Sequence, residues 1–420
     1  MTGPLDILMV TDAAPPAIAG GAERVLWEQA TRLSARGHHV RVLGRAPDTP
    51  PAYRGDAVLG ITHFPVDRRH PLAFFRTAAL GARAAAARLF AERRPDILHV
   101  HQPLAGFGVL RSPVARGVPA LYTFLSPAPS EYRSRRGMTA LHRRGARGAA
   151  ATAALWFLEW SCLRRAALVH VLSDFSARQL RALYGIAGSR IVKIAGGADI
   201  ERFRPPADRA AARAALGVRP QMALLFTVRN LEARMGLDRL LEAMARLRYF
   251  HPNAHLVVAG TGSRADELRR HATTLGIDDR VDFVGFVDDT RLAAYYQAAD
   301  AFVLPTRELE GFGLVTVEAL ACGTPVLGTP VGATPELLRP LEPSLLFRDA
   351  SVAGIADGID AFLRGFAGDP ARAAALRASC RRYAESQYGW DRSVNALERA
   401  LETVAGRGLR LVARPGEASA

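Results

Sequence analysis

Short apolar runs and amphipathic stretches alternate along the whole chain. Apolar runs of four or five residues are typical of strands buried in parallel sheets, and helical periodicity fills the stretches between them. We expect strands at Ile7–Val10, His39–Leu43, Ile97–His101, Ala120–Phe124, Leu168–Leu172 and Ile191–Ile194, and then at Leu224–Val228, Leu256–Ala259, Val281–Val284, Ala301–Leu304 and Pro325–Gly328. The expected helices include Gly21–Ala35, Leu237–Arg248, Thr290–Ala298 and Ser393–Val404. Strands joined through helices form parallel sheets with right-handed crossovers, so the sequence predicts an α/β fold.

The length of the chain predicts more than one domain. At 420 residues it exceeds the size of one ordinary hydrophobic core. The two series of strands meet near Gly196–Pro206, so we expect one doubly wound domain over residues 1–196 and another over 207–386. A hydrophobic content of 49% is typical of a soluble globular protein.

The basic excess of the chain lies entirely in its first half. Residues 1–195 hold 27 Lys and Arg against 12 Asp and Glu, whereas the rest of the chain holds 28 of each kind. The stretch Arg133–Arg165 has eight arginines around Trp156, Phe157 and Trp160. Three interpretations stay open: an interfacial helix on anionic lipid, an acceptor site for an anion, or a solvated face over a buried aromatic stripe. Nucleic acid is not an expected partner, because no recognition motif is visible.

Cysteine usage and apolar runs bear on the compartment. Cys162, Cys322 and Cys380 lie far apart and match no metal spacing, which is typical of a reducing compartment. The first strand pattern begins within a few residues of Met1, and the longest apolar run, Gly148–Leu158, is too short to span a bilayer. We therefore expect a cytoplasmic protein. Peripheral contact with the inner membrane face is the alternative that the basic first half allows.

The stretch Ala301–Gly332 contains the most informative chemistry. Its apolar strand is followed by Glu310, Gly311 and a helical pattern that contains Glu318. We expect Glu310 at a helix N-terminus, where backbone N–H groups attract anions, and Glu318 about two turns along on the same face. Two carboxylates beside an anion-binding helix end suit the hydroxyl groups and phosphates of a nucleotide-sugar.

The segment EGFGLVTVEALACGTPVL, residues 310–327, resembles the Glu-x7-Glu motif of the retaining glycosyltransferases of family 4, which have the GT-B fold. The resemblance implies two Rossmann-like domains that face an interdomain cleft, with residues 387–410 as a C-terminal helix that crosses back to the first domain. It also implies that Glu310 meets the donor sugar and that Glu318 binds the ribose hydroxyls. The other donor-binding residues of the motif are then Gly311, Phe312, Gly313 and Leu314.

Two arginines follow the first predicted strand of the second half. Arg229 and Arg234, at the carboxyl end of a strand in an open sheet, would neutralise a diphosphate leaving group. The resembled family has an Arg and a Lys at this spacing just before a glycine, and the two arginines lie one place early relative to Gly236. Counting from Gly236 gives the uncharged Asn230 and Met235. We therefore assign the role to the arginines, with ordinary surface arginines as the alternative.

Glycines mark three further loops. Gly20 and Gly21 begin the string GGAERV, where paired glycines let backbone N–H groups approach a phosphate, and the string is similar to the family's glycine loop. Gly262 in AGTG and Val287 in VDFVGFV lie in segments that resemble the donor-domain loops beside the nucleotide. No Gly-x-Gly-x-x-Gly with a following acid at dinucleotide spacing is present, which disfavours an oxidoreductase with tandem Rossmann domains.

Two histidines alternate on the strand ILHVH. His99 is interpreted as a core histidine, and His101, at the carboxyl edge, is a candidate for the acceptor pocket and the chemistry. A metal is not expected, because no third ligand lies nearby in sequence. The resembled family carries a histidine where this chain has Leu125, so another side chain, Ser126 or Tyr132 among the candidates, has to replace it.

The resemblance implies a metal-independent, retaining transfer of a sugar from a nucleotide-diphosphate sugar, of UDP or GDP type, to an acceptor hydroxyl. The acceptor classes are a small-molecule glycoside, a sugar phosphate or a lipid-linked glycan. No cofactor is expected. The alternative is a catalytically weakened relative that binds a nucleotide-sugar and partners another transferase, an interpretation that Leu125 supports.

Overall fold

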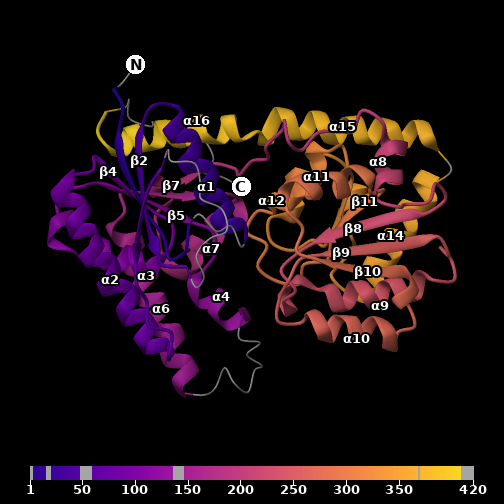
Figure 1. Cartoon of the computed structure of the whole chain (residues 1–420), viewed down its shortest axis with the longest axis horizontal. Helices are drawn as coiled ribbons and strands as arrows, with labels where there is room; N and C mark the ends of the chain where they lie inside the picture. The colour runs from indigo at the N-terminus through magenta and orange to yellow at the C-terminus, as the bar shows by residue number, and fades with distance from the viewer. Residues whose placement is uncertain (1–2, 16–19, 48–58, 136–145, 368, 408–420) are drawn as a thin grey trace, which may run out of the picture. The chain divides into compact units, whose positions relative to one another are not determined.

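The computed structural model describes residues 3–15, 20–47, 59–135, 146–367 and 369–407. The chain divides into two compact units (Figure 1). Unit 1 comprises Met1–Ala195 with Ser393–Ala420, and unit 2 comprises Gly196–Arg392. Each unit is a parallel sheet covered by helices, so the predicted α/β class is confirmed.

Unit 1 is built on a seven-stranded parallel sheet with the order β3-β2-β1-β4-β5-β6-β7. The strands are β1 (Asp6–Val10), β2 (His39–Arg45), β3 (Gly60–Phe64), β4 (Ile97–Val100), β5 (Ala120–Phe124), β6 (Leu168–Val171) and β7 (Ile191–Lys193). The helices are α1 (Gly21–Ala35), α2 (Pro71–Glu92), α3 (Pro103–Leu110), α4 (Ala128–Arg135), α6 (Ala146–Arg165), α7 (Asp174–Tyr184) and α16 (Trp390–Val404).

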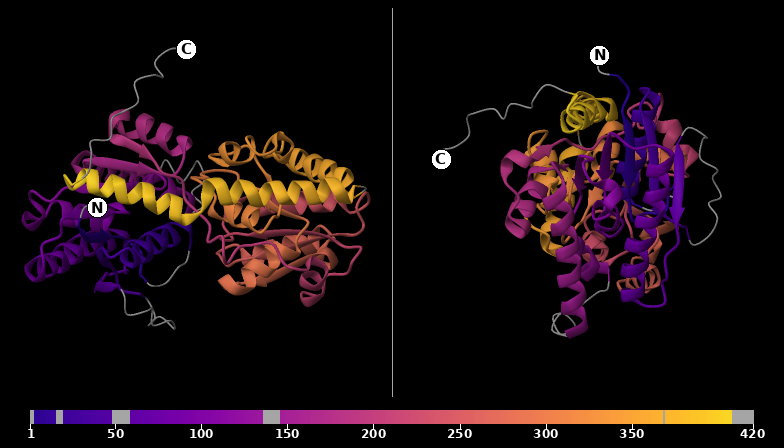
Figure 2. Two further views of the ribbon diagram at one scale, coloured as in Figure 1. Left: turned by 90° about the horizontal axis from the view of Figure 1, so that it is seen from above. Right: turned by 90° about the vertical axis from the view of Figure 1, so that its left-hand side faces the viewer.

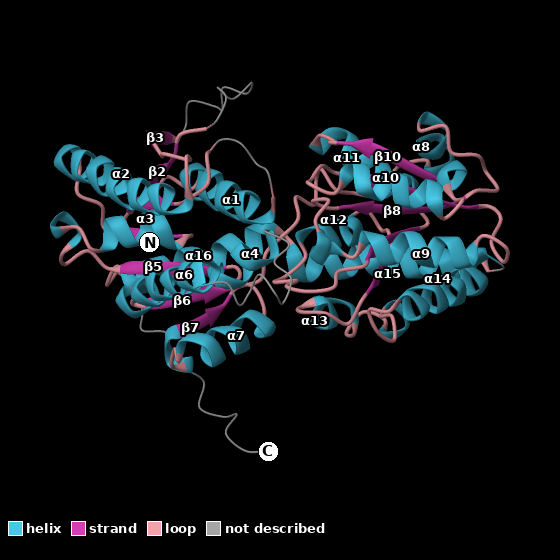
Figure 3. Ribbon diagram, turned by 90° about the horizontal axis from the view of Figure 1, so that it is seen from below, coloured by secondary structure: helices cyan, strands magenta, loops and turns pink. Residues whose placement is uncertain are grey.

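Helices bury both faces of this first sheet. Apolar residues of α2, α3, α6 and α7 form one core with alternate residues of the strands. The other core combines α1 with α16, whose Val394, Leu397 and Leu401 are fully buried against Ile7 and Met9 of β1. The helix that ends the described chain, yellow in Figure 2, is therefore part of the first unit's core. In Figure 3 the helices of this unit are cyan and the strands of its sheet are magenta.

Unit 2 is built on a five-stranded parallel sheet with the order β10-β9-β8-β11-β12. The strands are β8 (Ala223–Val228), β9 (Ala254–Ala259), β10 (Val281–Gly285), β11 (Ala301–Leu304) and β12 (Val326–Gly328). The helices are α8 (Arg209–Ala215), α9 (Leu237–Leu247), α10 (Ala265–Thr274), α11 (Asp289–Ala298), α12 (Leu314–Ala321), α13 (Thr334–Leu338), α14 (Val352–Ala367) and α15 (Pro370–Tyr388). The strand order reverses beside β8, which is where open α/β sheets bind ligands.

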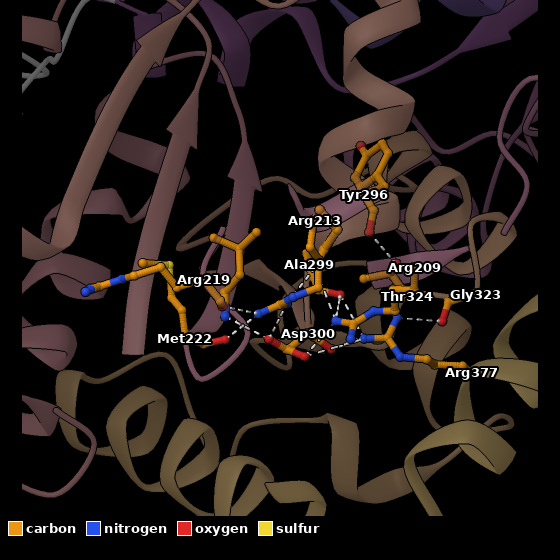
Figure 4. Close-up of polar contacts among 12 residues, drawn as sticks. Arg209, Arg213, Arg219, Met222, Tyr296, Ala299, Asp300, Gly323, Thr324 and Arg377 are labelled. Carbon is orange, nitrogen blue, oxygen red and sulfur yellow. Dashed lines mark hydrogen bonds and ion pairs between the residues drawn. The ribbon is translucent and has the colours of Figure 1, made fainter. Parts of the chain in front are cut away.

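An arginine cluster ties helices to the amino-terminal edge of this second sheet (Figure 4). Asp300, just before β11, accepts from Arg209 and Arg213 of α8 at 2.7 and 3.1 Å, and Arg377 of α15 lies 3.8 Å away. The Asp300 carboxylate also accepts from the backbone N–H of Leu224 at 2.8 Å. One carboxylate thus lies among the guanidinium groups of two helices, and Arg209 and Arg213 also donate to backbone carbonyls such as that of Ala298.

The predicted strands and helices agree with the structure apart from their ends and one omission. The sequence analysis missed β3, because only Ile61 and Phe64 are apolar in this half-exposed edge strand. The strand predicted to reach His101 ends at Val100. Within the described residues, no helix is both long enough and apolar enough to cross a membrane.

Candidate functional site

Glu310 lies on a strained loop between β11 and α12 rather than in the first turn of the helix. The helix begins at Leu314, so Glu310 is not a helical residue and cannot share a helix face with Glu318 as expected. The reason is Gly313, whose φ of 92° turns the chain into the helix only three residues later. The Glu310 carboxylate nevertheless lies at the helix N-terminus, because its Oε1 is 3.7 Å from the position that a Cβ would take on the N-cap residue Gly313. Leu309 has a φ of 61°, a left-handed backbone conformation that is unfavourable for a leucine. This conformation sets the direction of the backbone at Glu310, the next residue.

Buried hydrogen bonds hold the Glu310 side chain, which is 8% exposed. Its Oε2 accepts from Arg229 Nη2 at 2.7 Å and from Thr306 Oγ1 at 2.9 Å. The Glu310 carbonyl accepts from the N–H of Ala333 at 2.9 Å, and a Cβ on Gly332 would lie 2.1 Å from that oxygen. Both ends of the residue are therefore fixed, which is what a preorganised binding carboxylate requires.

Glu318 projects from α12 and is also buried, at 5% exposed. Its Oε2 accepts from the hydroxyl of Tyr296 in α11 at 3.2 Å. The Tyr296 ring is fully buried and packs edge-on against Phe226 and Phe302. Burial, with the nearby Glu318 charge, raises the pKa of Tyr296 well above its usual value, so the hydroxyl stays a donor. Sequence reasoning missed Tyr296, because the two residues lie on different helices.

The two predicted arginines meet the Glu310 loop. Arg229 is buried directly after β8, and its Nη2 bonds to Glu310, Thr306 and the sulfur of Met235. Arg234 donates from Nη1 to the carbonyl of Leu309 at 3.2 Å. One arginine thus bonds to the side chain of Glu310 and the other to the backbone before it.

The remaining residues of the motif, 311–314, have either no side chain or a buried one at the start of α12. Phe312 is buried and its ring lies edge-on to Tyr388, with centroids 5.9 Å apart. Leu314 packs beside Gly196, where a Cβ would be 2.9 Å from a Leu314 methyl carbon. Gly311 and Gly313 lie between Glu310 and the helix. Any contact of this segment with a donor would therefore come mainly from its N–H groups.

The Gly262 and Val287 loops lie at the carboxyl ends of neighbouring strands. A Cβ on Gly262 would lie 2.5 Å from the Leu231 nitrogen, so only glycine fits this approach of two backbones. The N–H of Gly260 bonds to the carbonyl of Gly285 at 2.7 Å, which joins the loops after β9 and β10. The Val287 side chain is buried.

In unit 1, Gly20 and Gly21 start the first helix. Gly20 is the N-cap of α1 and has extended backbone, and Gly21 is exposed. A glycine N-cap supplies no side-chain acceptor, so the first N–H groups of α1 can meet a ligand oxygen.

His101 is buried immediately after β4. Neither of its ring nitrogens has a hydrogen-bond partner among the described residues, and burial lowers the pKa of His101 to about 3. His99, by contrast, bonds through Nε2 to Thr123 Oγ1 at 2.7 Å, and Thr123 meets His170 at 3.0 Å. His99 is thus a core histidine, as predicted, whereas His101 is a buried, neutral imidazole whose two nitrogens have no hydrogen-bond partner among the described residues.

The candidates for replacing the family histidine are held by other contacts. Ser126 donates to Glu131 at 2.5 Å, and Tyr132 packs against the ring of Phe75. Among the described residues, no group of three or more His, Cys, Asp or Glu side chains could hold a metal ion.

A buried carboxylate that sequence reasoning missed lies under α4. Glu159 of α6 accepts from the hydroxyls of Tyr122 and Tyr184 and from the N–H of Ala128. Burial raises the pKa of Glu159 to about 7. The carboxyl group joins α4, α6, α7 and β5 at one point.

Comparison with known proteins gives matches over both units. The family model "Glycosyltransferase Family 4" matches residues 19–202, and the model "Glycosyl transferases group 1" matches residues 208–387. A D-inositol 3-phosphate glycosyltransferase of Mycobacterium leprae is 38% identical over 232 residues, which are 54% of this chain and 52% of that protein. The enzyme of the same name from Mycobacterium tuberculosis is matched over 46% of its length. The chain thus spans about half the length of these curated relatives.

Solved structures share the fold over nearly the whole chain. Sucrose-phosphate synthase from Thermosynechococcus elongatus superposes with a TM-score of 0.79 at 24% identity, covering 95% of this chain and 99% of that one. The Anabaena protein HepE, solved in complex with UDP and glucose, has a TM-score of 0.74 at 20% identity, covering 95% and 100%. The prediction made from the Glu-x7-Glu segment is confirmed: the chain belongs to the family 4, group 1 glycosyltransferases and has their GT-B fold.

Proposed function

We propose that this protein transfers a sugar from a nucleotide-diphosphate sugar to an acceptor hydroxyl with retention of the anomeric configuration. The observation that carries the proposal is the pair of buried carboxylates around the start of α12, each held by its own hydrogen-bond partner. Glu310 is fixed by Arg229 and Thr306, and Glu318 is fixed by Tyr296.

The start of α12 suits a diphosphate. Gly313 gives no side-chain cap to this eight-residue helix, so phosphate oxygens can accept from the first N–H groups at the positive end of the dipole. Glu318 then accepts from the ribose hydroxyls and Glu310 from a hydroxyl of the donor sugar. The backbone near Gly262 and Val287 borders the base.

The arginines supply the positive charge that the leaving group needs. Arg229 forms an ion pair with Glu310 at 2.7 Å, and its Nε has no hydrogen-bond partner among the described residues. With Arg234 it can stabilise the charge that develops on the departing diphosphate. We therefore propose metal-independent transfer, which predicts full activity in the presence of a chelator.

The bond changes follow a front-face displacement. The bond from the anomeric carbon to the diphosphate oxygen breaks, and the acceptor oxygen bonds to the same face of the carbon. The acceptor proton passes to the departing diphosphate. We assign His101 to the acceptor: its neutral imidazole can bond to a hydroxyl without carrying charge. Gly20 and Gly21 offer N–H groups to a phosphate of donor or acceptor.

The substrate class follows by analogy with the similar proteins. HepE was solved with UDP-glucose, so a UDP-sugar is the first donor to test and a GDP-sugar the second. The curated relatives are named for D-inositol 3-phosphate, a phosphorylated polyol, so a small phosphorylated polyol or sugar phosphate is the first acceptor class to test, and a lipid-linked acceptor is the other class. A catalytically weakened partner protein is not favoured, since the Glu310 and Glu318 sites are both intact.

The experiment is a donor panel followed by product analysis. Calorimetry of the purified protein should show binding of one nucleotide-sugar, and proton NMR of the product should show the donor's anomeric configuration. Glu310→Gln should abolish transfer. A protein that binds the nucleotide-sugar but neither transfers the sugar nor releases nucleoside diphosphate would be a weakened relative. A product with the inverted anomeric configuration would overturn the mechanism.

A further inference from the structure

An aromatic surface and a pocket lie together on unit 1, over α4, α6 and the end of α7. The pocket has a volume of about 470 Å³. It is lined by residues that include Pro127, Ser130, Arg133, Thr152, Trp156 and Tyr184. Beside it, α6 presents Phe157, which is 48% exposed, and Leu183 of α7 is also exposed. We call Arg133, Trp156, Phe157, Trp160, Arg164 and Leu183 the α6 surface.

The structure excludes the interpretation that the arginines here are a solvated face over a buried aromatic stripe. Trp156 is 40% exposed and Phe157 more so. The indole N–H of Trp156 donates to the carbonyl of Leu183 at 3.1 Å, so the part that faces solvent is hydrocarbon. Exposed apolar side chains gathered around a pocket are rare on a surface that meets only water.

The geometry of the rings favours hydrocarbon over a sugar as the occupant. Trp156 stacks with both Trp160 and Tyr184, at 5.9 Å and within 16° of parallel in each case. Two neighbouring rings therefore cover part of the Trp156 faces, whereas a stacked sugar needs a free face. Ring edges and the Phe157 side chain are left to contact a flexible apolar chain.

Positive charge surrounds this apolar area. Arg133 lines the pocket and is exposed, and the guanidinium of Arg164 lies 5.5 Å from the Trp160 ring centre. Of the two nearest acids in sequence, Glu131 accepts from Ser126 and Glu159 is buried below α4. Between Glu131 and Glu159 the sequence contains six arginines and no acid.

We propose that the α6 surface docks on an anionic phospholipid bilayer, with a lipid acyl chain in the pocket and the lipid phosphates on Arg133 and Arg164. Aromatic side chains with flanking arginines are the combination that interfacial surfaces use. The pocket is preformed, since Glu159 bonds to both Ala128 and Tyr184 and thus fixes α4 and α7 against α6. This inference is independent of the sugar chemistry proposed above.

The test is co-sedimentation of the full chain with vesicles at physiological ionic strength. Wild type should pellet with equimolar phosphatidylglycerol and phosphatidylcholine and stay in solution with phosphatidylcholine alone. Arg133→Ala should weaken binding about fivefold, since one interfacial arginine contributes about 1 kcal/mol. Phe157→Asp should abolish it. The matched control is Phe250→Asp, a 70% exposed aromatic residue of unit 2, which should bind like wild type.

Acyl-chain contact has its own readout. Vesicles whose phospholipids carry brominated acyl chains should quench tryptophan fluorescence, and Trp156→Phe should lose most of that quenching while still pelleting. Equal binding to neutral and anionic vesicles would overturn the proposal. The proposal would also be overturned if the Phe157→Asp variant bound anionic vesicles as tightly as wild type, or if wild type bound free inorganic phosphate but no vesicles. Circular dichroism of each variant confirms that it is folded.

Discussion

Tyr296→Phe removes one oxygen atom from beneath the proposed ribose-binding carboxylate. The wild-type hydroxyl donates to Glu318 Oε2 at 3.2 Å from a fully buried position, so no water can take its place without repacking. Phenylalanine fills the same space between Phe226 and Phe302, and no cavity is created. The variant therefore isolates the hydrogen bond from the packing of the ring.

The size of the effect follows from the charge on the acceptor. A hydrogen bond to a charged group contributes about 1.5–3 kcal/mol. If about half of this acts through the orientation of Glu318, ribonucleotide affinity falls about tenfold, because 1.4 kcal/mol corresponds to a factor of ten. A nucleotide that lacks the 2′-hydroxyl should lose less, since it makes less use of Glu318.

The assay is calorimetric titration with a nucleoside diphosphate and its 2′-deoxy form. Wild type should prefer the ribonucleotide, and Tyr296→Phe should reduce that preference. Tyr295→Phe is the matched control, since its ring stacks on Phe226 at 5.2 Å one residue earlier on the same helix. The reasoning is refuted if Tyr296→Phe keeps the full preference. Absence of any preference in wild type would instead refute the ribose role of Glu318.

Three further changes test other parts of the structure. Because burial raises the pKa of Glu159 from 4.5 to about 7, the folded state binds the extra proton. The free energy of unfolding should thus decrease by about 3 kcal/mol as the pH rises from 4.5 to 7. In the Glu159→Gln variant, the unfolding free energy measured by urea titration should lose this dependence on pH. Gly332→Ala would push a methyl group against Glu310 and should lower kcat by about a hundredfold, as expected for a 1 Å misplacement, whereas Gly217→Ala, with a similar positive φ but open space, should keep it. Asp300→Asn leaves the arginine cluster without its counterion and should cost about 3 kcal/mol of unfolding free energy, measured by thermal denaturation.

The fold could be predicted from the sequence because its signals are local. Buried parallel strands such as Ala301–Leu304 are continuous apolar runs, and α1 was predicted at its observed bounds, Gly21–Ala35. β3 was missed because an edge strand exposes half of its residues and loses that signal. The helix boundary near Glu310 was wrong because the conformation of Gly313 depends on the loop it closes.

The partners of the site residues could not be predicted, because they are distant in sequence. Arg229 and Glu310 are 81 residues apart, and Tyr122 and Glu159 are 37 apart. No period or spacing in the sequence connects them, and only the packing of helices and loops on the sheets brings them together. Motif resemblance identified the carboxylates, and the structure shows which donors hold them.

Glu318 is proposed to accept hydrogen bonds from the ribose hydroxyls of the donor nucleotide. Calorimetric titration of the Glu318→Gln variant with the nucleoside diphosphate tests this role most directly. The carboxamide keeps the size of the side chain and removes its charge. Loss of a charged hydrogen bond to ribose predicts affinity at least about tenfold weaker than wild type. Unchanged affinity in a variant with wild-type thermal stability would contradict the account.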